Sequence, residues 1–141
     1  MTPTITEILS QIHSTDSKNQ KKQILLSNNT PYLQTFLKLA FDPSIQFHLS
    51  DFPKQYQPST DTAPGISYSD IPSELKRVYL FQIGNPTADS LSPEKRSLLL
   101  LQLLESFHPD EAKTFINMLN KNLKVKGLTD NLIKEVFPNL L

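Results

Sequence analysis

Two short stretches of the chain combine residue types that can bind an anion. The first, residues 18–22, carries three closely spaced lysines. The second is Lys124-Val125-Lys126-Gly127, followed by Thr129. Gly127 permits the positive φ of a tight turn, and Thr129 can cap the next helix by accepting a hydrogen bond from a free amide. A helix start flanked by lysines suits a phosphate of a nucleic-acid backbone. The candidate backbone-binding residues are therefore Lys18, Lys21, Lys22, Lys124, Lys126, Gly127 and Thr129.

The second stretch lies between two predicted helices. The first helix shows the apolar spacing of one helical face at Phe115, Ile116, Leu119 and Leu123. The second shows it again at Leu132, Ile133, Val136 and Phe137, and Pro138 ends it. The alternative interpretation is a purely structural turn with solvated lysines, because most turns of this kind bind nothing.

The charges cancel over the whole chain but are unevenly distributed. Fourteen Lys and Arg balance fourteen Asp and Glu, which argues against strong DNA binding through the overall field. Residues 17–41 hold four lysines and no acid, and residues 112–129 hold four more and no acid. Residues 42–75 hold five acids and one lysine. If the two basic segments fold side by side, they form a positive face.

Helical periodicity runs through most of the chain, and no segment alternates with period two. The 141 residues are therefore predicted to form one all-α domain, residues 1–141, with about seven helices. Thr30-Pro31 and Ser92-Pro93 have the order of a helix cap followed by a first helical residue. A further short helix is expected from Asp42-Pro43, and one long irregular loop is expected at about residues 53–72. The leucine-rich helix after Ser92 is expected to be the most buried, in a core that includes Leu98, Leu101, Phe115, Leu119, Ile133 and Phe137.

Residues for catalysis or metal binding are missing from the sequence. Cysteine is absent, and His13, His48 and His108 are too far apart for ligand spacing. There is no Gly-rich phosphate loop, nucleophile elbow or His-Glu-x-x-His pair. We expect a protein that is not an enzyme and uses no cofactor or metal. With no long apolar run and no signal-peptide pattern, a cytoplasmic protein without a membrane partner is expected.

Both ends of the chain show a distinctive order of elements. The opening has a helix, a Ser/Thr-Lys turn, a Lys/Gln-rich helix ending in Asn, and a helix running into Phe41-Asp42-Pro43, with an aromatic at Phe47. The close has the corner Lys126-Gly127-Leu128-Thr129 and the exit Phe137-Pro138-Asn139-Leu140. In these features the chain resembles the N-terminal domain of bacteriophage ATP-dependent DNA ligases. The resemblance covers essentially the whole chain and is weakest in the middle loop. It implies an all-helical domain of the ligase DNA-binding type, which grips the duplex across the minor groove through the sugar-phosphate backbone.

The resemblance does not extend to ligase chemistry. No Lys-x-Asp-Gly adenylation motif occurs in this sequence. The first hypothesis is therefore a stand-alone, phage-encoded accessory protein of the host cytoplasm that binds double-stranded DNA, nicked or intact, without reading sequence. The second hypothesis is an adaptor or virion component that reuses the fold to bind a replication, transcription or virion protein. The segregation of charge along the chain favours the first hypothesis, and the zero net charge and the acidic, Pro-rich loop favour the second.

Overall fold

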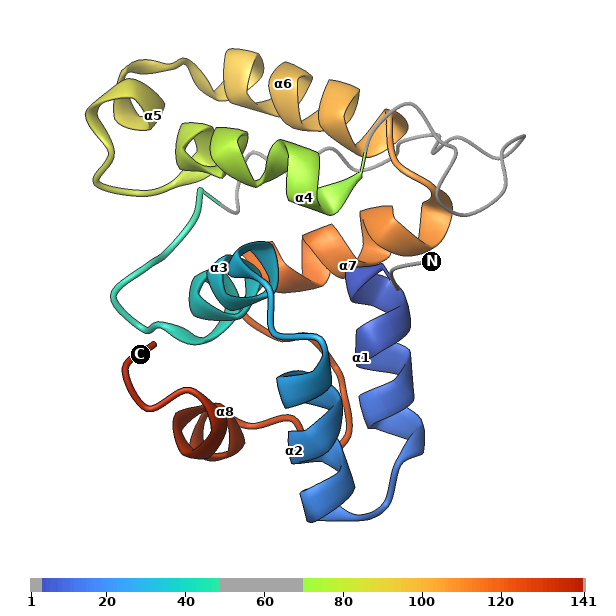
Figure 1. Cartoon of the computed structure of the whole chain (residues 1–141). Coiled ribbons are helices and arrows are strands. Elements are labelled where there is room, and N and C mark those ends of the chain that lie inside the picture. The colour runs from blue at the N-terminus through green and yellow to red at the C-terminus, as the bar shows by residue number, and fades with distance from the viewer. Residues whose placement is uncertain (1–3, 49–69, 141) are drawn as a thin grey trace.

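The described part of the chain folds into α-helices and one 3-10 helix (Figure 1). A computed structural model describes residues 4–48 and 70–140. Within these ranges no strand forms, and a single isolated bridge joins Phe47 to Gln82, so the all-α prediction is confirmed. The helices are α1 Ile5–Ser14, α2 Lys18–Ser27, α3 Pro31–Phe41, α4 Ile71–Glu74, the 3-10 helix η2 Leu75–Phe81, α5 Pro86–Ser90, α6 Pro93–Glu105, α7 Pro109–Leu119 and α8 Asp130–Val136.

Most helices begin at polar caps, and the sequence predicts those at Thr30, Ser92 and Thr129. Thr4 forms a capping box with Glu7, in which each side chain accepts a hydrogen bond from the other residue's amide. Thr30 and Ser92 cap α3 and α6, each with proline at the first helical position. Asn85 caps α5 in the same way before Pro86. This short helix was not predicted, because Asn85-Pro86 follows Gly84 and has the pattern of a helix end.

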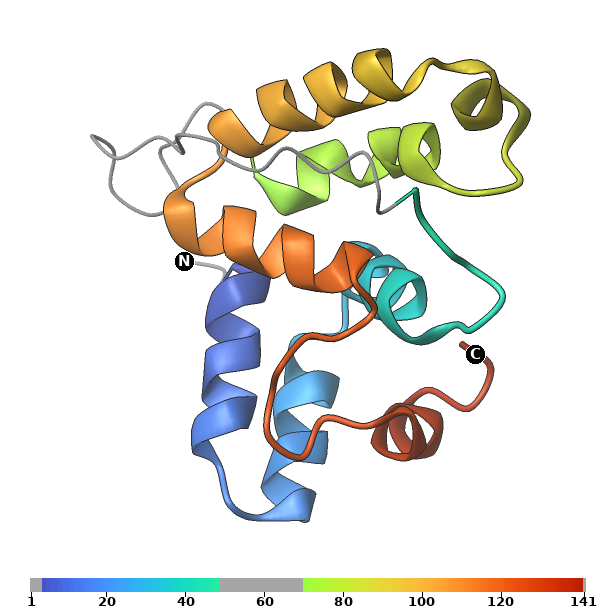
Figure 2. The ribbon, with the colours of Figure 1, turned by 180° about the vertical axis from the view of Figure 1, so that it is seen from behind.

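The helices are stacked in three tiers (Figures 1 and 2). α3 and α7 lie in the middle, with α4, η2, α5 and α6 on one side and α1, α2 and α8 on the other. Because α7 packs against α1, α3 and α6, it buries the most residues: Glu111, Ala112, Thr114, Phe115, Met118 and Leu119. One continuous apolar core connects the tiers and contains four of the predicted residues, Phe115, Leu119, Ile133 and Phe137.

The prediction that the leucine-rich helix is the most buried is wrong. α6 lies at the outside of the stack, where Leu98 is 47% exposed and Leu101 is only half-buried. An apolar run on a helix does not predict how many of the helix's sides other elements will cover. Here α7 lies on one side of α6, and Leu100, Leu103 and Leu104 provide the buried face.

Two further expectations are corrected in the middle of the chain. Asp42-Pro43 starts a turn and not a helix, because Asp42 Oδ1 accepts hydrogen bonds from the amide and hydroxyl of Ser44. Residues 53–69 of the predicted loop lie outside the described residues. Its last two residues, Ile71 and Pro72, begin α4, which Asp70 caps by accepting from the amide of Ser73 at 2.9 Å.

Candidate nucleic-acid interface

The two lysine-rich stretches lie side by side at one end of the molecule. This basic end consists of residues 13–27, from the end of α1 through α2, and residues 120–136, the connector after α7 followed by α8. Its sequence contains seven lysines and three acids, whereas the remainder of the chain contains seven Lys and Arg and eleven acids. Figure 2 shows the connector running alongside α2 towards α8. The neutral total therefore hides an excess of lysines at this end of the fold.

Lys21 is the residue that joins the two stretches. Its side chain is 6% exposed, and its ammonium donates to the carbonyl oxygens of Ile12 at 2.6 Å and Lys126 at 3.0 Å. Gly127, next to Lys126, has a φ of +77°, as the sequence predicts. A Cβ at Gly127 would lie 2.7 Å from Cε of Lys21, closer than real contacts allow. Lys21 and Gly127 thus shape the basic end, and neither presents a free group to a ligand.

Thr129 has the capping role that the sequence predicts. Its hydroxyl accepts a hydrogen bond from the amide of Leu132 at 3.2 Å and so starts α8. α8 is only seven residues long, and Asp130 already places a carboxylate in its first turn. The start of α8 is therefore supplied with its own negative charge, and the lysines remain the stronger candidates for phosphate contacts.

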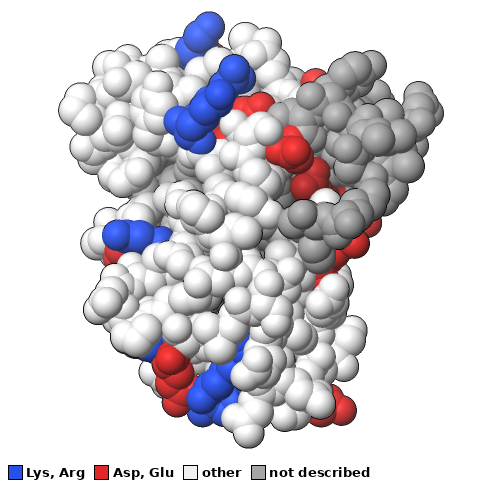
Figure 3. Space-filling view, in the orientation of Figure 1, with Lys and Arg blue, Asp and Glu red and all other residues white. Residues whose placement is uncertain are grey.

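Lys18 and Lys22 share one acidic partner on α8. Their ammonium groups lie 3.2 Å and 3.1 Å from Oε2 of Glu135. The hydrogen bond from Lys22, followed by that from Lys18, lowers the pKa of the Glu135 carboxyl, which stays ionised near neutral pH. In Figure 3, blue and red atoms adjoin at the lower end, where α2 and α8 lie. A phosphate that reaches these lysines would have to compete with Glu135.

Lys124 and Lys126 project from the connector without such competition. Both are exposed, and within the described residues neither ammonium has a hydrogen bond or an ion pair. They line a cavity of about 350 Å³ whose walls are His13, Phe41, Lys121, Asn122, Leu123, Lys124, Val125, Lys126 and Leu128. A neighbouring cavity of about 730 Å³ is lined by Asp42 and Asp130 as well as Lys121 and Lys134, and so is less suited to an anion.

Side chains distant in sequence hold the connector in place. His13 Nδ1 accepts a hydrogen bond from the amide of Lys126 at 3.0 Å. The ammonium of Lys121 donates to the carbonyl oxygens of Leu39 and Asp42 at the end of α3, and lies 5.8 Å from the ring centroid of Phe47. Burial lowers the pKa of Lys121, and nearby Asp42 acts in the opposite direction. Lys121 was counted in the basic segment 112–129, but its role as an anchor was not predicted, and His13 and Glu135 were not predicted as parts of this end. No local pattern marks contacts across about 80 to 115 positions.

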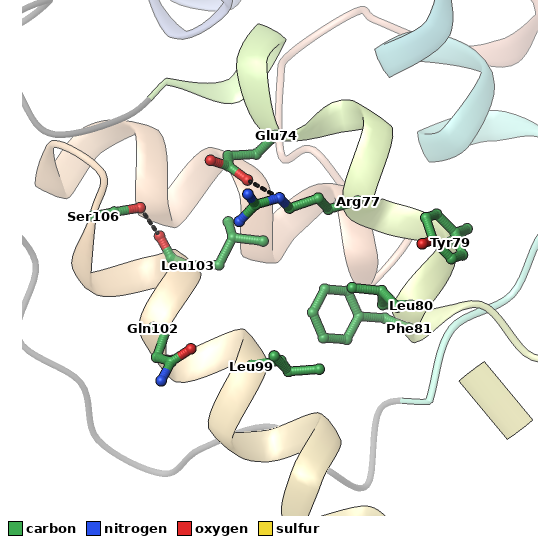
Figure 4. A pocket seen from close by; sticks show the side chains of 9 residues that line it. All are labelled: Glu74, Arg77, Tyr79, Leu80, Phe81, Leu99, Gln102, Leu103 and Ser106. Atoms are coloured by element: carbon green, nitrogen blue, oxygen red, sulfur yellow. Dashed lines mark hydrogen bonds and ion pairs between the residues drawn. The ribbon is translucent and has the colours of Figure 1, made fainter. Parts of the chain in front are cut away.

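A third hollow lies at the opposite end, between η2 and α6 (Figure 4). Its volume is about 490 Å³, and Tyr79, Leu80, Phe81 and Leu99 give it an apolar wall. Glu74 and Arg77 form an ion pair of 3.6 Å at its edge. Exposed apolar side chains occur on the same elements and beside them, namely Tyr79, Ile83 and Leu98. This surface has the character of a protein contact and lacks the lysines of the basic end.

Comparison with known proteins places the chain in a family without assigning a role. The model of a family of unknown function (DUF6433) matches residues 8–125. No curated protein matches the sequence. Among the described residues, no three His, Asp or Glu side chains are grouped so that they could hold a metal ion. No helix in this part of the chain is long and apolar enough to cross a membrane.

Proposed function

The chain belongs to this family of unknown function, and we propose that it is a non-catalytic accessory protein that binds duplex DNA through the sugar-phosphate backbone, without reading sequence. The carrying observation is that two lysine-rich segments about 100 residues apart meet at one end, where Lys21 bonds the Lys126 carbonyl. The likeness of both chain ends to phage DNA ligase domains points the same way, towards an all-helical backbone-binding module. Lys18, Lys22, Lys124 and Lys126 provide the phosphate contacts, while Lys21, Gly127 and Thr129 shape the surface that carries them.

The excess of lysines at the basic end suits binding to the DNA backbone. Lysine contacts to phosphates release condensed counterions, so affinity depends steeply on salt and little on base sequence. Of the four lysines, Lys18 and Lys22 are paired with the carboxylate of Glu135, which competes with phosphate. The four lysines together therefore support about three effective phosphate contacts. The expected binding is then of about micromolar strength at physiological salt, consistent with a chain of zero net charge.

Salt-dependent fluorescence anisotropy with a labelled blunt duplex tests the proposal. The logarithm of the association constant should fall with the logarithm of the salt concentration with a slope of about −3. Lys126→Ala should weaken binding by the same factor on unrelated sequences and make the slope shallower by about one. The matched control is Lys95→Ala, an exposed lysine on α6 at the other end of the fold.

The anisotropy results decide whether the basic end binds DNA. No binding at low salt, or equal effects of Lys126→Ala and Lys95→Ala, would exclude the basic end as a DNA surface. The non-catalytic part of the proposal has its own test, since the sequence lacks the Lys-x-Asp-Gly motif. Incubation with labelled ATP should leave no covalent adenylate on the protein, and a labelled band at 16.0 kDa would contradict it.

The hollow between η2 and α6 favours a second candidate, a protein-protein adaptor. Tyr79 is 44% exposed and Ile83 is 52% exposed, and large apolar side chains of this kind are enriched where proteins associate. Under this alternative, Tyr79→Ser would abolish the association of the chain with a replication, transcription or virion protein, while Lys126→Ala would leave it intact. Failure of DNA binding together with such a result would replace the first candidate by the second.

A further inference from the structure

The cavity beside the connector is lined by positive and apolar groups and by no acid. Its nine lining residues include three lysines and one histidine. Lys124 and Lys126 have no carboxylate within 4.0 Å among the described residues. An anion that enters this cavity therefore meets positive charge without a competing acid in the wall.

Two more side chains offer hydrogen-bond donors there. His13 Nδ1 already accepts from the amide of Lys126, so the neutral ring carries its proton on Nε2, which remains a donor. Asn122 Oδ1 accepts from the amide of Lys124 at 3.2 Å, which leaves the side-chain NH₂ of Asn122 with two donors. These groups can bind phosphate oxygens or the polar edge of a base.

The apolar part of the lining is not needed for a phosphate alone. Phe41, at the end of α3, is half-buried and contributes an aromatic ring to the lining, together with Leu123, Val125 and Leu128. Aromatic side chains close to lysines are the usual platform for a base that is not paired, because every base has a face that can stack. A blunt duplex keeps its bases stacked inside and would leave this part of the cavity unused.

The backbone of the connector is fixed in a form that lysine rarely adopts. Lys121 and Lys124 have φ values of 60° and 57°, a region favoured by Gly and Asn. The ammonium of Lys121 anchors the connector to the carbonyl oxygens of Leu39 and Asp42. Strained positions of this kind concentrate at binding sites, where the surrounding structure maintains them. Position 124 thus holds a lysine although Asn or Gly would adopt this φ with less strain.

We infer that this cavity binds one unpaired nucleotide of a DNA strand, with its phosphate on Lys124 and Lys126 and its base against Phe41. The inference rests on the proposed DNA binding and narrows its ligand from any duplex to a duplex with an unpaired end. The ligand class is a nucleoside phosphate, which can belong to a DNA strand or be a free mononucleotide. The strand is the proposed source because Lys18 and Lys22 lie on the same end and can hold the adjoining duplex.

Anisotropy with two labelled probes tests the inference: a blunt duplex, and the same duplex with a 5′ overhang of three thymines. The wild-type protein should bind the overhang probe about tenfold more tightly than the blunt one, the range expected for stacking of one base. Phe41→Leu should abolish this preference and leave the affinity for the blunt probe unchanged. Tyr32→Leu, a half-buried aromatic on the same helix that does not line the cavity, should retain the preference.

Lys124→Asn provides a variant that is expected to fold, since Asn tolerates positive φ. It should weaken overhang binding more than blunt binding and should not lower the melting temperature. Equal affinity of the wild type for both probes would overturn the inference and leave the proposed DNA binding standing. Absence of binding to both probes at low salt would overturn the proposed function itself. Titration with thymidine monophosphate, followed by NMR, distinguishes a DNA strand from a free mononucleotide as the ligand. Chemical-shift changes at Phe41 and His13 without a preference for the overhang probe would contradict binding of a strand.

Discussion

The side chain of Lys21 occupies the space beside Gly127 where any other residue would place its β-carbon. A Cβ there would lie 2.7 Å from Cε of Lys21 and 3.2 Å from its Nζ. The ammonium is thereby held against the carbonyl oxygens of Ile12 and Lys126. Lys21, which the sequence predicts as a phosphate contact, is therefore a buried link between α2 and the connector.

The first prediction follows from this contact. Gly127→Ala should lower the free energy of unfolding by about 2–4 kcal/mol, because it adds the cost of positive φ to the displacement of Lys21 from two carbonyl oxygens. Gly84→Ala is the matched control: Gly84 has a φ of +91°, but a Cβ at this position would meet nothing within 4 Å, so only about 1–2 kcal/mol should be lost. Urea denaturation of both variants measures the difference. Equal losses would show that the space beside Lys21 does not matter.

How far the sequence predicted the basic end depends on the range of each interaction. The cap at Thr129 and the turn at Gly127 are set by neighbours within three residues, and both were predicted. The meeting of the two basic segments was a conditional expectation, and the fold fulfils it. The burial of Lys21 was not predictable from its polar surroundings in α2, because a long aliphatic stem can lie buried while its charge finds oxygen partners.

The same limit explains the errors in the core. The apolar run of α6 looks equally fit for burial on every side, yet Leu98 is exposed because no helix among residues 4–48 and 70–140 covers it. Phe115 and Leu119 were placed correctly because α7 has one clear apolar face. Glu111 lies in the first turn of that same helix, where an acid usually complements the helix dipole at the surface. Its burial beside α1 and α4 depends on tertiary packing.

The second prediction concerns this buried carboxyl. Glu111 is 4% exposed, and burial is the main cause that raises its pKa to about 7; Asp70 and Glu7 add to the rise, and the backbone amide of Ile71 opposes it. The folded state thus holds a proton that the unfolded state has released above its ordinary pKa of 4.5. Stability should be highest below about pH 4.5 with respect to this group and should fall as the pH rises to about 7.

Glu111→Gln removes this pH dependence. Above pH 7 the variant should be more stable than the wild type by up to about 3 kcal/mol, and below pH 4.5 the two should be similar. Thermal unfolding between pH 4 and pH 8.5 measures the effect. Glu94→Gln, an exposed acid on α6, is the control and should follow the wild type at every pH. A constant difference between Glu111→Gln and the wild type across the range would contradict the assignment.

The third prediction concerns Lys121, which anchors the connector to the end of α3. Lys121→Met keeps the aliphatic stem near Phe47 but removes the donor to the carbonyl oxygens of Leu39 and Asp42. The free energy of unfolding should fall by about 1–3 kcal/mol, as expected when partly buried acceptors lose a charged donor. Lys113→Met, at an exposed position of α7, should change it by less than about 0.5 kcal/mol. Similar stabilities of the two variants in urea would show that the anchor is not needed.

The last prediction tests whether Glu135 limits DNA binding. Its Oε2 lies 3.2 Å from Lys18 Nζ and 3.1 Å from Lys22 Nζ, so one carboxylate competes with phosphate for two lysines. Glu135→Gln should raise the affinity for a blunt duplex several-fold and steepen the salt slope by about one, since removing the shared carboxylate raises the effective phosphate contacts from about three to about four. The lysines lower the pKa of Glu135, so the carboxylate is ionised throughout the neutral range and the gain should not change between pH 6 and pH 8.

Glu94→Gln changes the net charge by the same amount at the far end of the fold and is therefore the matched control. If the general field of the protein governed binding, both variants would gain equally, because one acid is removed in each. If local competition governs it, only Glu135→Gln gains, and adding Lys22→Ala to it should take back most of the increase. Anisotropy against salt for these three variants distinguishes the two cases. An unchanged affinity of Glu135→Gln would mean that Lys18 and Lys22 do not contact the DNA backbone.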